Sequence, residues 1–474
     1  MEVIRNYING EWIEPHYSET VELRDPATLK HVAVVGISSK DDVNLAVDSA
    51  ENASNRSQWG DDPALRSDAM LQMSINAKKS AEEIAEEITR ENGQLIKNSR
   101  MEALYAPGTI KYYSGLAENV NGRSTVISPS SMAVIMREPV GVVGIIVPWN
   151  APIYLLVRSL GPALAAGNSV VIKPSIYTTG STAKFLKSML SGVNIPPGVI
   201  NMVVGTGETV GEQLVSNRKV DMISFTGDTR TGKSIMKKAA DQLKRVSLEL
   251  GGKSPNIILD DANIEKAVRG AVQGACFYMA GQICFAGTRL LVQKEIASKI
   301  ADRVKAIFGT LKIGPGSDES TDVPPLISGQ QVNKVINYIE EGRKEAKLYA
   351  GGRHLGGYFI EPTLFTETPI NSSIFREEIF GPVLTMTEFE TLEEAAELAN
   401  STNYGLAAGV WSSSIDGAMR LARKIKAGTV WINDYGKMYH QAIGGGYKES
   451  GMGRLYGIEG LNEFTELKHI NINY

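Results

Sequence analysis

The stretch VVGIIVPWN at residues 142–150 decides the fold. Its first six residues, Val142 to Val147, are apolar or glycine at every position, and Pro148 ends the run. A strand without alternation of polar and apolar residues is buried on both faces, which is typical of the inner strands of parallel α/β sheets. The run therefore predicts one strand of such a sheet.

The same pattern recurs further along the chain. Strand-length apolar runs follow at 169–173, 199–204, 222–226 and 246–250, with helix-length segments at about 153–166, 179–190, 208–217 and 231–241. A second series of strand candidates lies at 256–259, 289–292, 383–388, 408–411 and 429–433. Alternating strands and helices indicate parallel sheets covered by helices, so we predict two α/β units.

Two segments fit neither unit. Residues 124–137 are typical of a protruding hairpin, and residues 468–474 of a terminal strand. Because exposed strand edges pair readily with another chain, both segments indicate self-association.

The composition excludes several classes of protein. Of the 474 residues 43% are hydrophobic and 22% are charged, and the formal net charge is −4, which gives no electrostatic reason to expect nucleic acid or membrane partners. No apolar run approaches the ~18–20 residues of a membrane-spanning helix, and the first residues have no signal-peptide core. Two cysteines and five histidines, without a Cys-x-x-Cys pair, predict neither a disulfide framework nor a metal site. We expect a cytoplasmic protein with free thiols.

One of those cysteines has the surroundings of a nucleophile. Cys284 follows Gly281-Gln282-Ile283 and precedes a run of small residues, so backbone N–H groups can approach an atom bonded to its sulfur. Cys276, between Ala275 and Phe277, is interpreted as a core residue.

Two polar residues at predicted strand ends complete the candidate chemistry. Glu249 lies between Leu248 and Leu250, and burial there would raise its pKa, which suits a general base. Asn150 ends the first strand, and its amide can donate a hydrogen bond to a developing oxyanion. The strand ends at 173–175, 205–211 and 226–232 could hold a dinucleotide, although the usual Gly-x-Gly-x-x-Gly fingerprint is missing.

These motifs are linked in a familiar order. The chain contains VPWN at 147–150, KPS at 173–175, FTG at 225–227, ELGGK at 249–253, GQIC at 281–284, EEIFGPV at 377–383 and GGYKESG at 445–451. Over essentially its whole length it resembles the NAD(P)-dependent aldehyde dehydrogenase superfamily. The resemblance implies an α/β fold with two Rossmann-like domains and a small β oligomerisation element, and a homodimer or homotetramer. It implies a cofactor-binding domain at 1–118 and 141–249, a catalytic domain at 250–459, and the oligomerisation element at 119–140 and 460–474.

The resemblance also implies a mechanism. The Cys284 thiolate attacks the aldehyde carbon, Asn150 and the Cys284 N–H hold the oxyanion, hydride transfer leaves a thioester, and Glu249 activates water to hydrolyse it. The residues implied in cofactor binding are Ile146, Val147, Pro148, Trp149, Lys173, Ser175, Ile176, Gly205, Gly211, Phe225, Thr226, Gly227, Leu250, Glu378 and Phe380.

Two departures from the family pattern concern the cofactor. Many NAD-using members carry a glutamate where this chain has Ile176, and a carboxylate there repels a 2′-phosphate. We therefore expect NADP in preference to NAD, although Ile176 could simply pack while Lys173 binds NAD. Asp228 stands where a serine is usual, and we expect it to turn away and cap the helix that starts near Arg230.

A third departure concerns the substrate. Members that act on apolar aldehydes carry aromatic residues at positions where this chain has Ala151, Arg158 and Gly444. We expect the entrance to the substrate site to be formed by Arg158, Tyr278 and Gly444, with His440 or Gln441. Such an entrance predicts a small polar aldehyde. Glyceraldehyde fits, and so does succinic semialdehyde, whose far carboxylate Arg158 would bind. The alternative for Arg158 is a salt bridge outside the pocket.

Three other functions are compatible with this fold. An NAD-dependent succinate-semialdehyde or general aldehyde dehydrogenase is the main alternative. A CoA-acylating enzyme is disfavoured because such enzymes commonly lack the glutamate at Glu249. A non-catalytic structural protein is disfavoured because Cys284, Glu249 and Asn150 are all present.

Overall fold

The first of two large sheets is built around the apolar stretch at residues 142–150. A computed structural model describes residues 3–474. The sheet has the strand order β2-β1-β9-β8-β7-β10-β11-β23. Its strands are β1 (Asn6–Ile8), β2 (Glu11–Ile13), β7 (Val142–Ile146), β8 (Ser169–Lys173), β9 (Ile200–Met202), β10 (Met222–Thr226), β11 (Arg245–Glu249) and β23 (Gly451–Met452). The five central strands are parallel, as predicted, and β1 and β23 pair antiparallel at its flanks.

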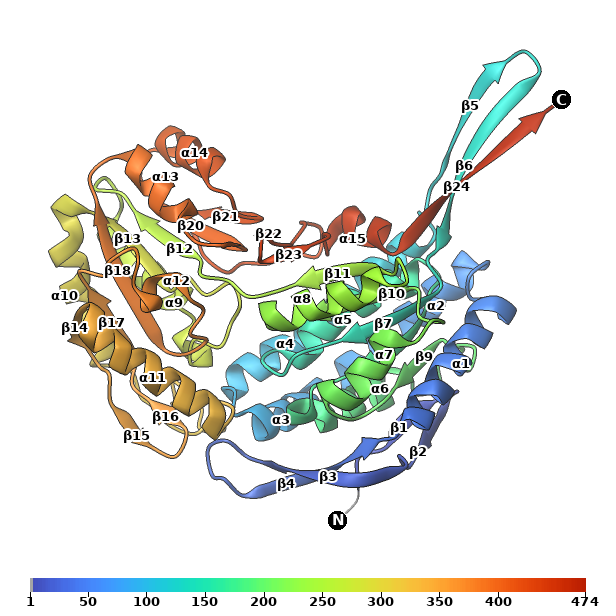
Figure 1. Ribbon diagram of the computed structural model, residues 1–474, viewed down its shortest axis with the longest axis horizontal. Coiled ribbons are helices and arrows are strands. Elements are labelled where there is room, and N and C mark those ends of the chain that lie inside the picture. Colours follow the sequence, from blue (N-terminus) through green and yellow to red (C-terminus); the bar gives the residue numbers. More distant parts are fainter. Residues whose placement is uncertain (1–2) are drawn as a thin grey trace.

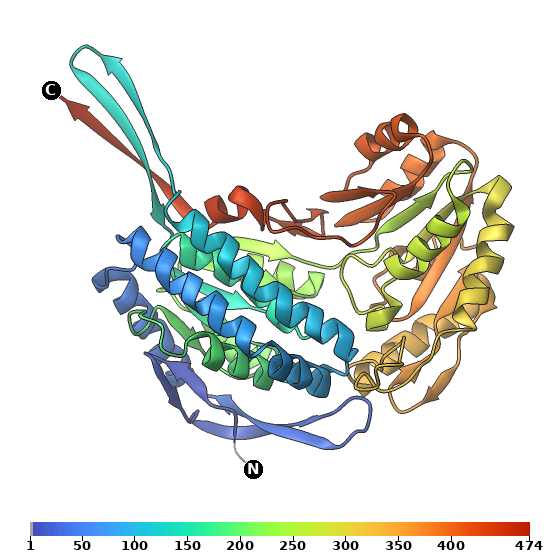
Figure 2. The ribbon, with the colours of Figure 1, turned by 180° about the vertical axis from the view of Figure 1, so that it is seen from behind.

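Helices on both faces explain why the central strands carry apolar residues on both sides. Val142 and Ile146 pack with one group of helices, whereas Val143 and Ile145 pack with the other, because successive side chains of a strand point to opposite faces. The first group is α1 (Lys40–Arg56), α7 (Glu212–Ser216) and α8 (Thr229–Ala240), and the second is α2 (Pro63–Lys79), α3 (Ala81–Asn92), α4 (Ile96–Ala117), α5 (Pro152–Ala165) and α6 (Thr179–Met189). Figures 1 and 2 show the two layers.

One predicted helix is shorter than expected. The segment 208–217 forms a π-helical turn at Gly207–Gly211, and only then the short helix α7. Two glycines in five residues weaken a regular α-helix, which accounts for the difference.

The second sheet has the order β14-β17-β18-β13-β12-β20-β21. Its strands are β12 (Pro255–Ile258), β13 (Arg289–Gln293), β14 (Lys347–Ala350), β17 (Thr363–Thr366), β18 (Val383–Phe389), β20 (Ala407–Trp411) and β21 (Thr429–Ile432). The helices of this unit are α9 (Ile264–Gly274), α10 (Ala297–Phe308), α11 (Gly329–Glu345), α12 (Ser373–Arg376), α13 (Leu392–Asn400) and α14 (Ile415–Lys424). The five predicted strands are present, while β14 and β17 at one side of the sheet were not predicted.

A three-stranded ribbon projects from the body of the molecule (Figure 1). It consists of β5 (Arg123–Ser128), β6 (Ser131–Pro139) and β24 (Thr465–Asn473), in the order β24-β6-β5. The predicted hairpin is therefore confirmed, and the terminal strand begins at Thr465 rather than at 468. Large apolar side chains are exposed along the ribbon, at Val126, Ile127, Met136, Leu467, Ile470 and Ile472.

Smaller elements connect these parts. They are the two-stranded pairs β3 (Tyr17–Arg24) with β4 (His31–Ser38), β15 (His354–Gly356) with β16 (Phe359–Ile360), and β19 (Tyr404–Gly405) with β22 (Tyr447–Lys448), and helix α15 (Gly457–Glu463). Within residues 3–474 no helix has the length and apolarity needed to cross a membrane. The same residues contain no group of three or more His, Cys, Asp or Glu side chains arranged to hold a metal ion.

Candidate active site

Three adjoining cavities lie along the carboxyl ends of the first sheet. The central cavity, of ≈ 210 Å³, shares Pro148, Thr226 and Gly227 with a second cavity of ≈ 530 Å³. It shares Asn150, Leu155 and Cys284 with a third cavity of ≈ 290 Å³. Cys284 and Asn150 therefore lie where two cavities meet, and a molecule in either one can reach them.

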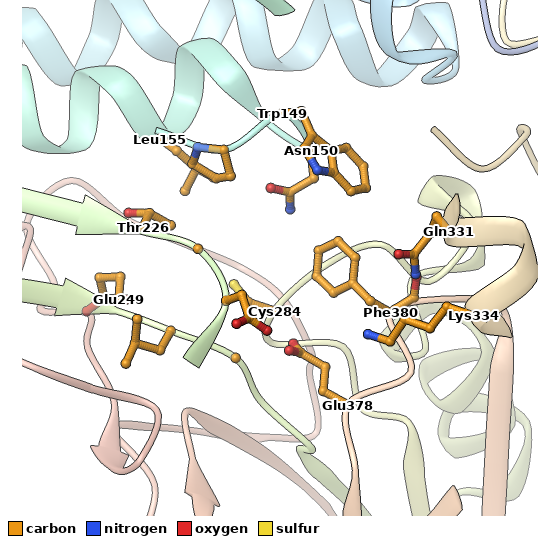
Figure 3. Close-up of a pocket in the computed structure, with 15 residues that line it drawn as sticks. Trp149, Asn150, Leu155, Thr226, Glu249, Cys284, Gln331, Lys334, Glu378 and Phe380 are labelled. Atoms are coloured by element: carbon orange, nitrogen blue, oxygen red, sulfur yellow. The ribbon is translucent and has the colours of Figure 1, made fainter. Parts of the chain in front are cut away.

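The central cavity is lined from both α/β units (Figure 3). It gathers ten of the predicted site residues, namely Pro148, Trp149, Asn150, Thr226, Gly227, Glu249, Leu250, Cys284, Glu378 and Phe380. Gln331 and Lys334, one turn apart on α11, also line it and were not predicted. Trp149 and Phe380 meet edge to face across the cleft, with ring centroids 5.6 Å apart.

A tight loop presents Cys284. Gly281 has a positive φ of 70°, and a Cβ atom at this position would lie 2.1 Å from the Gly381 carbonyl oxygen. The Asn150 amide Nδ2 donates to the Gln282 carbonyl oxygen at 2.9 Å, and Asn98 Nδ2 donates to the Tyr278 carbonyl oxygen at 2.8 Å. The loop of the second unit is thus fixed by side chains of the first.

The Cys284 thiol lies in surroundings that disfavour its ionised form. Burial raises its pKa to about 12, the Arg158 cation opposes that shift, and the carboxylates of Glu378 and Glu249 add to it. The thiol is therefore protonated near neutral pH, and it needs a proton acceptor before it can act as a nucleophile.

Glu249 is the last residue of β11 and is only 4% exposed. Burial raises its pKa, while Arg158 and Arg454 lower it. Arg158 Nη1 donates to Glu249 Oε2 at 3.3 Å, and Glu249 Oε1 is buried without a hydrogen-bond partner among the described residues. A carboxylate with a raised pKa and one free oxygen can accept a proton from a bound water.

Arg158 takes the alternative position expected for it, in a salt bridge outside the three cavities, and not that of a substrate residue. It is 6% exposed, donates from Nη2 to Thr226 Oγ1 at 2.8 Å, and lines none of the three cavities. Its contact with Glu249 is a buried salt bridge. The prediction of a substrate-binding Arg158 is corrected accordingly, because the carboxylate that it meets belongs to the protein.

The third cavity contains one of the predicted substrate residues, Tyr278. Gly444 instead pairs with Leu455 in an isolated bridge, and neither it nor Gln441 lines the cavity. His440 packs behind the lining, with its ring 4.2 Å from that of Tyr105.

Most of the residues that line the third cavity were not predicted from the sequence. Asn98, Met101, Glu102 and Tyr105 line it from one stripe of α4, and Tyr154, Phe285 and Met438 add aromatic and thioether surface. The i, i+3, i+4, i+7 spacing of the α4 residues is the signal that could have identified a common face. Glu102 is already engaged, since Oε1 accepts from the backbone N–H groups of Ile153 and Tyr154 at 2.8 and 3.0 Å.

The second cavity contains most of the predicted cofactor residues. Ile146, Val147, Pro148, Lys173, Ser175, Gly211, Phe225, Thr226 and Gly227 line it. Gly205 and Ile176 do not line this cavity. Gly205 packs closely against Val210, since a Cβ atom at Gly205 would lie 2.5 Å from that side chain, and Ile176 begins a short 3-10 turn. Glu208, Glu212, Arg230 and Lys238 also line the cavity and were not predicted.

The polar groups that line the second and the central cavity fit a dinucleotide. Lys173 is a buried amine whose pKa burial lowers to about 8, with Glu208 opposing the shift. Glu378 accepts from the Gly252 N–H at 3.0 Å, and burial raises its pKa to about 7. Its carboxyl oxygens can accept hydrogen bonds from ribose hydroxyl groups. Asp228 caps α8 by accepting from the N–H groups of Arg230 and Thr231 at 2.9 and 3.2 Å, which confirms the predicted cap.

The chain matches the aldehyde dehydrogenase family over residues 12–470. It is 40% identical to the betaine aldehyde dehydrogenase of Bacillus subtilis (strain 168), across 98% of this chain and 97% of the relative. It is 38% identical to the NADP/NAD-dependent aldehyde dehydrogenase PuuC of Escherichia coli (strain K12), across 99% and 95%. Two solved NAD+ complexes superpose with a TM-score of 0.97. They are betaine aldehyde dehydrogenase from Staphylococcus aureus, with 38% identity over 99% of this chain and 95% of that one, and aldehyde dehydrogenase from Bacillus cereus, with 39% over 100% and 97%.

Two α/β units that flank this cleft, together with the family match, define an NAD(P)-dependent oxidoreductase. More narrowly, the chain belongs to the aldehyde dehydrogenase family, and it is an NAD(P)-dependent aldehyde dehydrogenase of the non-acylating superfamily. The resemblance seen in the sequence is therefore confirmed.

The geometry of the Cys284 loop gives a first testable prediction. Gly281→Ala should lower kcat by about 100-fold, because a Cβ atom 2.1 Å from the Gly381 oxygen must displace the loop. Steady-state reduction of NAD(P)+ by an aldehyde measures the effect. Gly192→Ala is the matched control, since Gly192 has a similar φ of 66° with nothing within 4 Å of its Cβ position. Equal kcat values for the two variants would contradict the prediction.

Proposed function

We propose that the enzyme oxidises its aldehyde through a covalent thioester on Cys284, with Asn150 as the oxyanion donor and Glu249 as the base. The observation that carries this proposal is the position of Cys284 and Asn150, which line both the central and the third cavity, while Glu249 lines the central one. An aldehyde from one side and a nicotinamide from the other would meet at this thiol.

The steps follow from the residues. The Cys284 thiol gives its proton to a water molecule in the cleft, its sulfur bonds to the aldehyde carbon, and the C=O electron pair moves to oxygen. One N–H of the Asn150 amide is held by Gln282, so the other is available to the oxyanion, a contact worth roughly 2.7–4 kcal/mol in the transition state. Bound NAD(P)+ supplies the acceptor for the hydride that leaves this carbon.

Hydrolysis completes the turnover. Glu249 removes a proton from a water whose oxygen adds to the thioester carbon, the C–S bond breaks, and the carboxylic acid leaves. The free oxygen of Glu249 and its raised pKa support this role.

A pair of variants tests the covalent route. Cys284→Ala should form no reduced cofactor with any aldehyde, while still binding NADP+. Glu249→Gln should give a burst of about one equivalent of reduced cofactor followed by slow turnover, because acylation proceeds and hydrolysis does not. Stopped-flow absorbance at the reduced-nicotinamide band reports both. Activity in Cys284→Ala, or loss of the burst together with turnover in a folded Glu249→Gln, would overturn the assignment.

We also propose that NADP is preferred over NAD. Lys173, Ser175 and Arg230 line the second cavity, and Ile176 brings no carboxylate to it. Of the two acidic residues there, Glu212 is paired with Lys238. A relative of 38% identity is named as NADP/NAD-dependent.

Ile176→Glu tests this preference. The added carboxylate should lower the ratio of kcat/KM for NADP to that for NAD by at least about tenfold, through repulsion of the 2′-phosphate. Ile176→Gln is the control of equal size without charge. The idea fails if the two variants give the same ratio.

For the substrate, we propose a small aldehyde whose far end is neutral or cationic. The third cavity is lined by Tyr105, Tyr154, Tyr278 and Phe285, and by Glu102, with no lysine or arginine among its lining residues. Aromatic faces favour cations over anions. Glyceraldehyde and betaine aldehyde therefore fit better than succinic semialdehyde, for which Arg158 is no longer a partner.

A substrate panel checks this expectation. Glyceraldehyde and betaine aldehyde should each give a kcat/KM at least about tenfold above that of succinic semialdehyde, since an anionic end would be buried without a partner. Acetaldehyde is the control for the reacting group alone. A kcat/KM for succinic semialdehyde above those of both others would refute the proposed selectivity.

Assembly and location are proposed from the same observations. We propose that the β5-β6-β24 ribbon, with its exposed apolar side chains, joins copies of the chain into a dimer or tetramer. Residues 1–118 and 141–249 would bind the cofactor and residues 250–459 supply the nucleophile. A reducing cytoplasm would keep the free Cys284 thiol reactive.

A further inference from the structure

Helix α5 carries three site residues on one face. It begins at Pro152, two residues after Asn150, and Tyr154, Leu155 and Arg158 follow at i, i+1 and i+4. Tyr154 and Leu155 line the third cavity, whereas Arg158 is one turn deeper and is buried. This stripe explains why a residue expected at the substrate mouth lies beside the strand ends instead.

The Arg158 guanidinium spans two neighbouring strands. Thr226 and Glu249 are directly paired residues at the ends of the parallel strands β10 and β11. Nη2 donates to Thr226 Oγ1 at 2.8 Å and Nη1 donates to Glu249 Oε2 at 3.3 Å. Because an arginine is a rigid fork, contact with both residues fixes the place of the Glu249 carboxylate on its strand.

From this geometry we propose that Arg158 is a positioning residue for Glu249, which keeps the carboxylate ionised and leaves Oε1 free to take the proton from the hydrolytic water. The proposal rests on the role of Glu249 proposed above. It goes further in assigning the arginine to the hydrolysis step and in removing it from substrate recognition.

Burial makes the pairing a necessity for both groups. Arg158 and Glu249 are 6% and 4% exposed, and an isolated charge at such depth is strongly disfavoured. Only one nitrogen of Arg158 contacts Glu249, and Arg158 Nε has no hydrogen-bond partner among the described residues. A single contact holds Oε2 and does not occupy Oε1.

Two cations offset the effect of burial on Glu249, and further titratable groups surround the pair. Arg158 on α5 and Arg454 after β23 face Glu249 and lower its pKa against the effect of burial. Tyr154, Tyr456 and Cys284 face Arg158. Asp228, Lys334 and Glu378 line the same central cavity. Removing the cation of Arg158 should therefore raise the pKa of Glu249.

Arg158→Met tests the proposal. Hydrolysis requires the ionised carboxylate, so it declines as the pH falls through the Glu249 pKa. A higher pKa must move the acidic limb of the kcat profile to higher pH, by about 1–3 units. We expect kcat at neutral pH to fall at least about tenfold, with the reduced-cofactor burst retained and KM for glyceraldehyde changed less than about threefold. Arg158→Lys, which keeps a cation at this position, should recover part of the shift.

A double variant separates this role from a structural one. In Glu249→Gln the acidic limb should disappear, and adding Arg158→Met should slow hydrolysis less than threefold further, because the arginine acts through the glutamate. An unmoved limb in both Arg158→Met and Arg158→Lys overturns the proposal, as does a selective rise of KM for succinic semialdehyde. Absence of a burst in folded Glu249→Gln would refute the proposed base itself and is thus distinguishable. If Arg158→Met does not fold, the pH profiles of kcat for Arg158→Lys and Glu249→Gln still test the proposal.

Discussion

The hydrogen bond from the Asn150 amide to the Gln282 carbonyl is the contact on which the site depends. It joins the end of a strand in the first sheet to the loop of the second unit that carries Cys284. The close approach of Gly281 to the Gly381 carbonyl leaves this loop little freedom, and Asn98 braces it from α4. One side-chain amide thus joins the two α/β units beside the nucleophile.

Around that contact, low polarity controls the ionisation of the site. Burial raises the pKa of Cys284, Glu249 and Glu378, so none of these groups behaves as it would in water. Arg158 is the cation that opposes this effect on both the thiol and Glu249. The charge balance of the cleft is therefore a local matter among a few buried groups, and the net charge of the whole chain has little bearing on it.

The inner strands and the motif residues could be predicted from the sequence because each carries a local signal. Continuous apolar runs mark the strands at 142–147 and 222–226, and the motifs place Cys284, Glu249 and Asn150 at strand ends and a loop. Arg158 could not be placed, since its partner depends on how far α5 turns beyond Asn150. The lining of the third cavity could not be predicted because α4 precedes the motifs by many residues and its lining residues look like an ordinary helix face. Strands β14 and β17 were not predicted because neither sequence stands out from its neighbours as a buried strand.

Late segments of the chain complete early parts of the fold. Gly451 on β23 pairs with Glu249, and Ser450 Oγ donates to the Gly251 carbonyl oxygen across 199 positions of sequence. Strand β24 likewise covers β6 along its length. During synthesis from the N-terminus, the edges of β11 and β6 stay open until nearly the whole chain has emerged, and such long-range closures are slow. The strand that carries the carboxylate is thus among the last to be sealed, so a nascent chain remains inert and prone to aggregation until its final residues have docked.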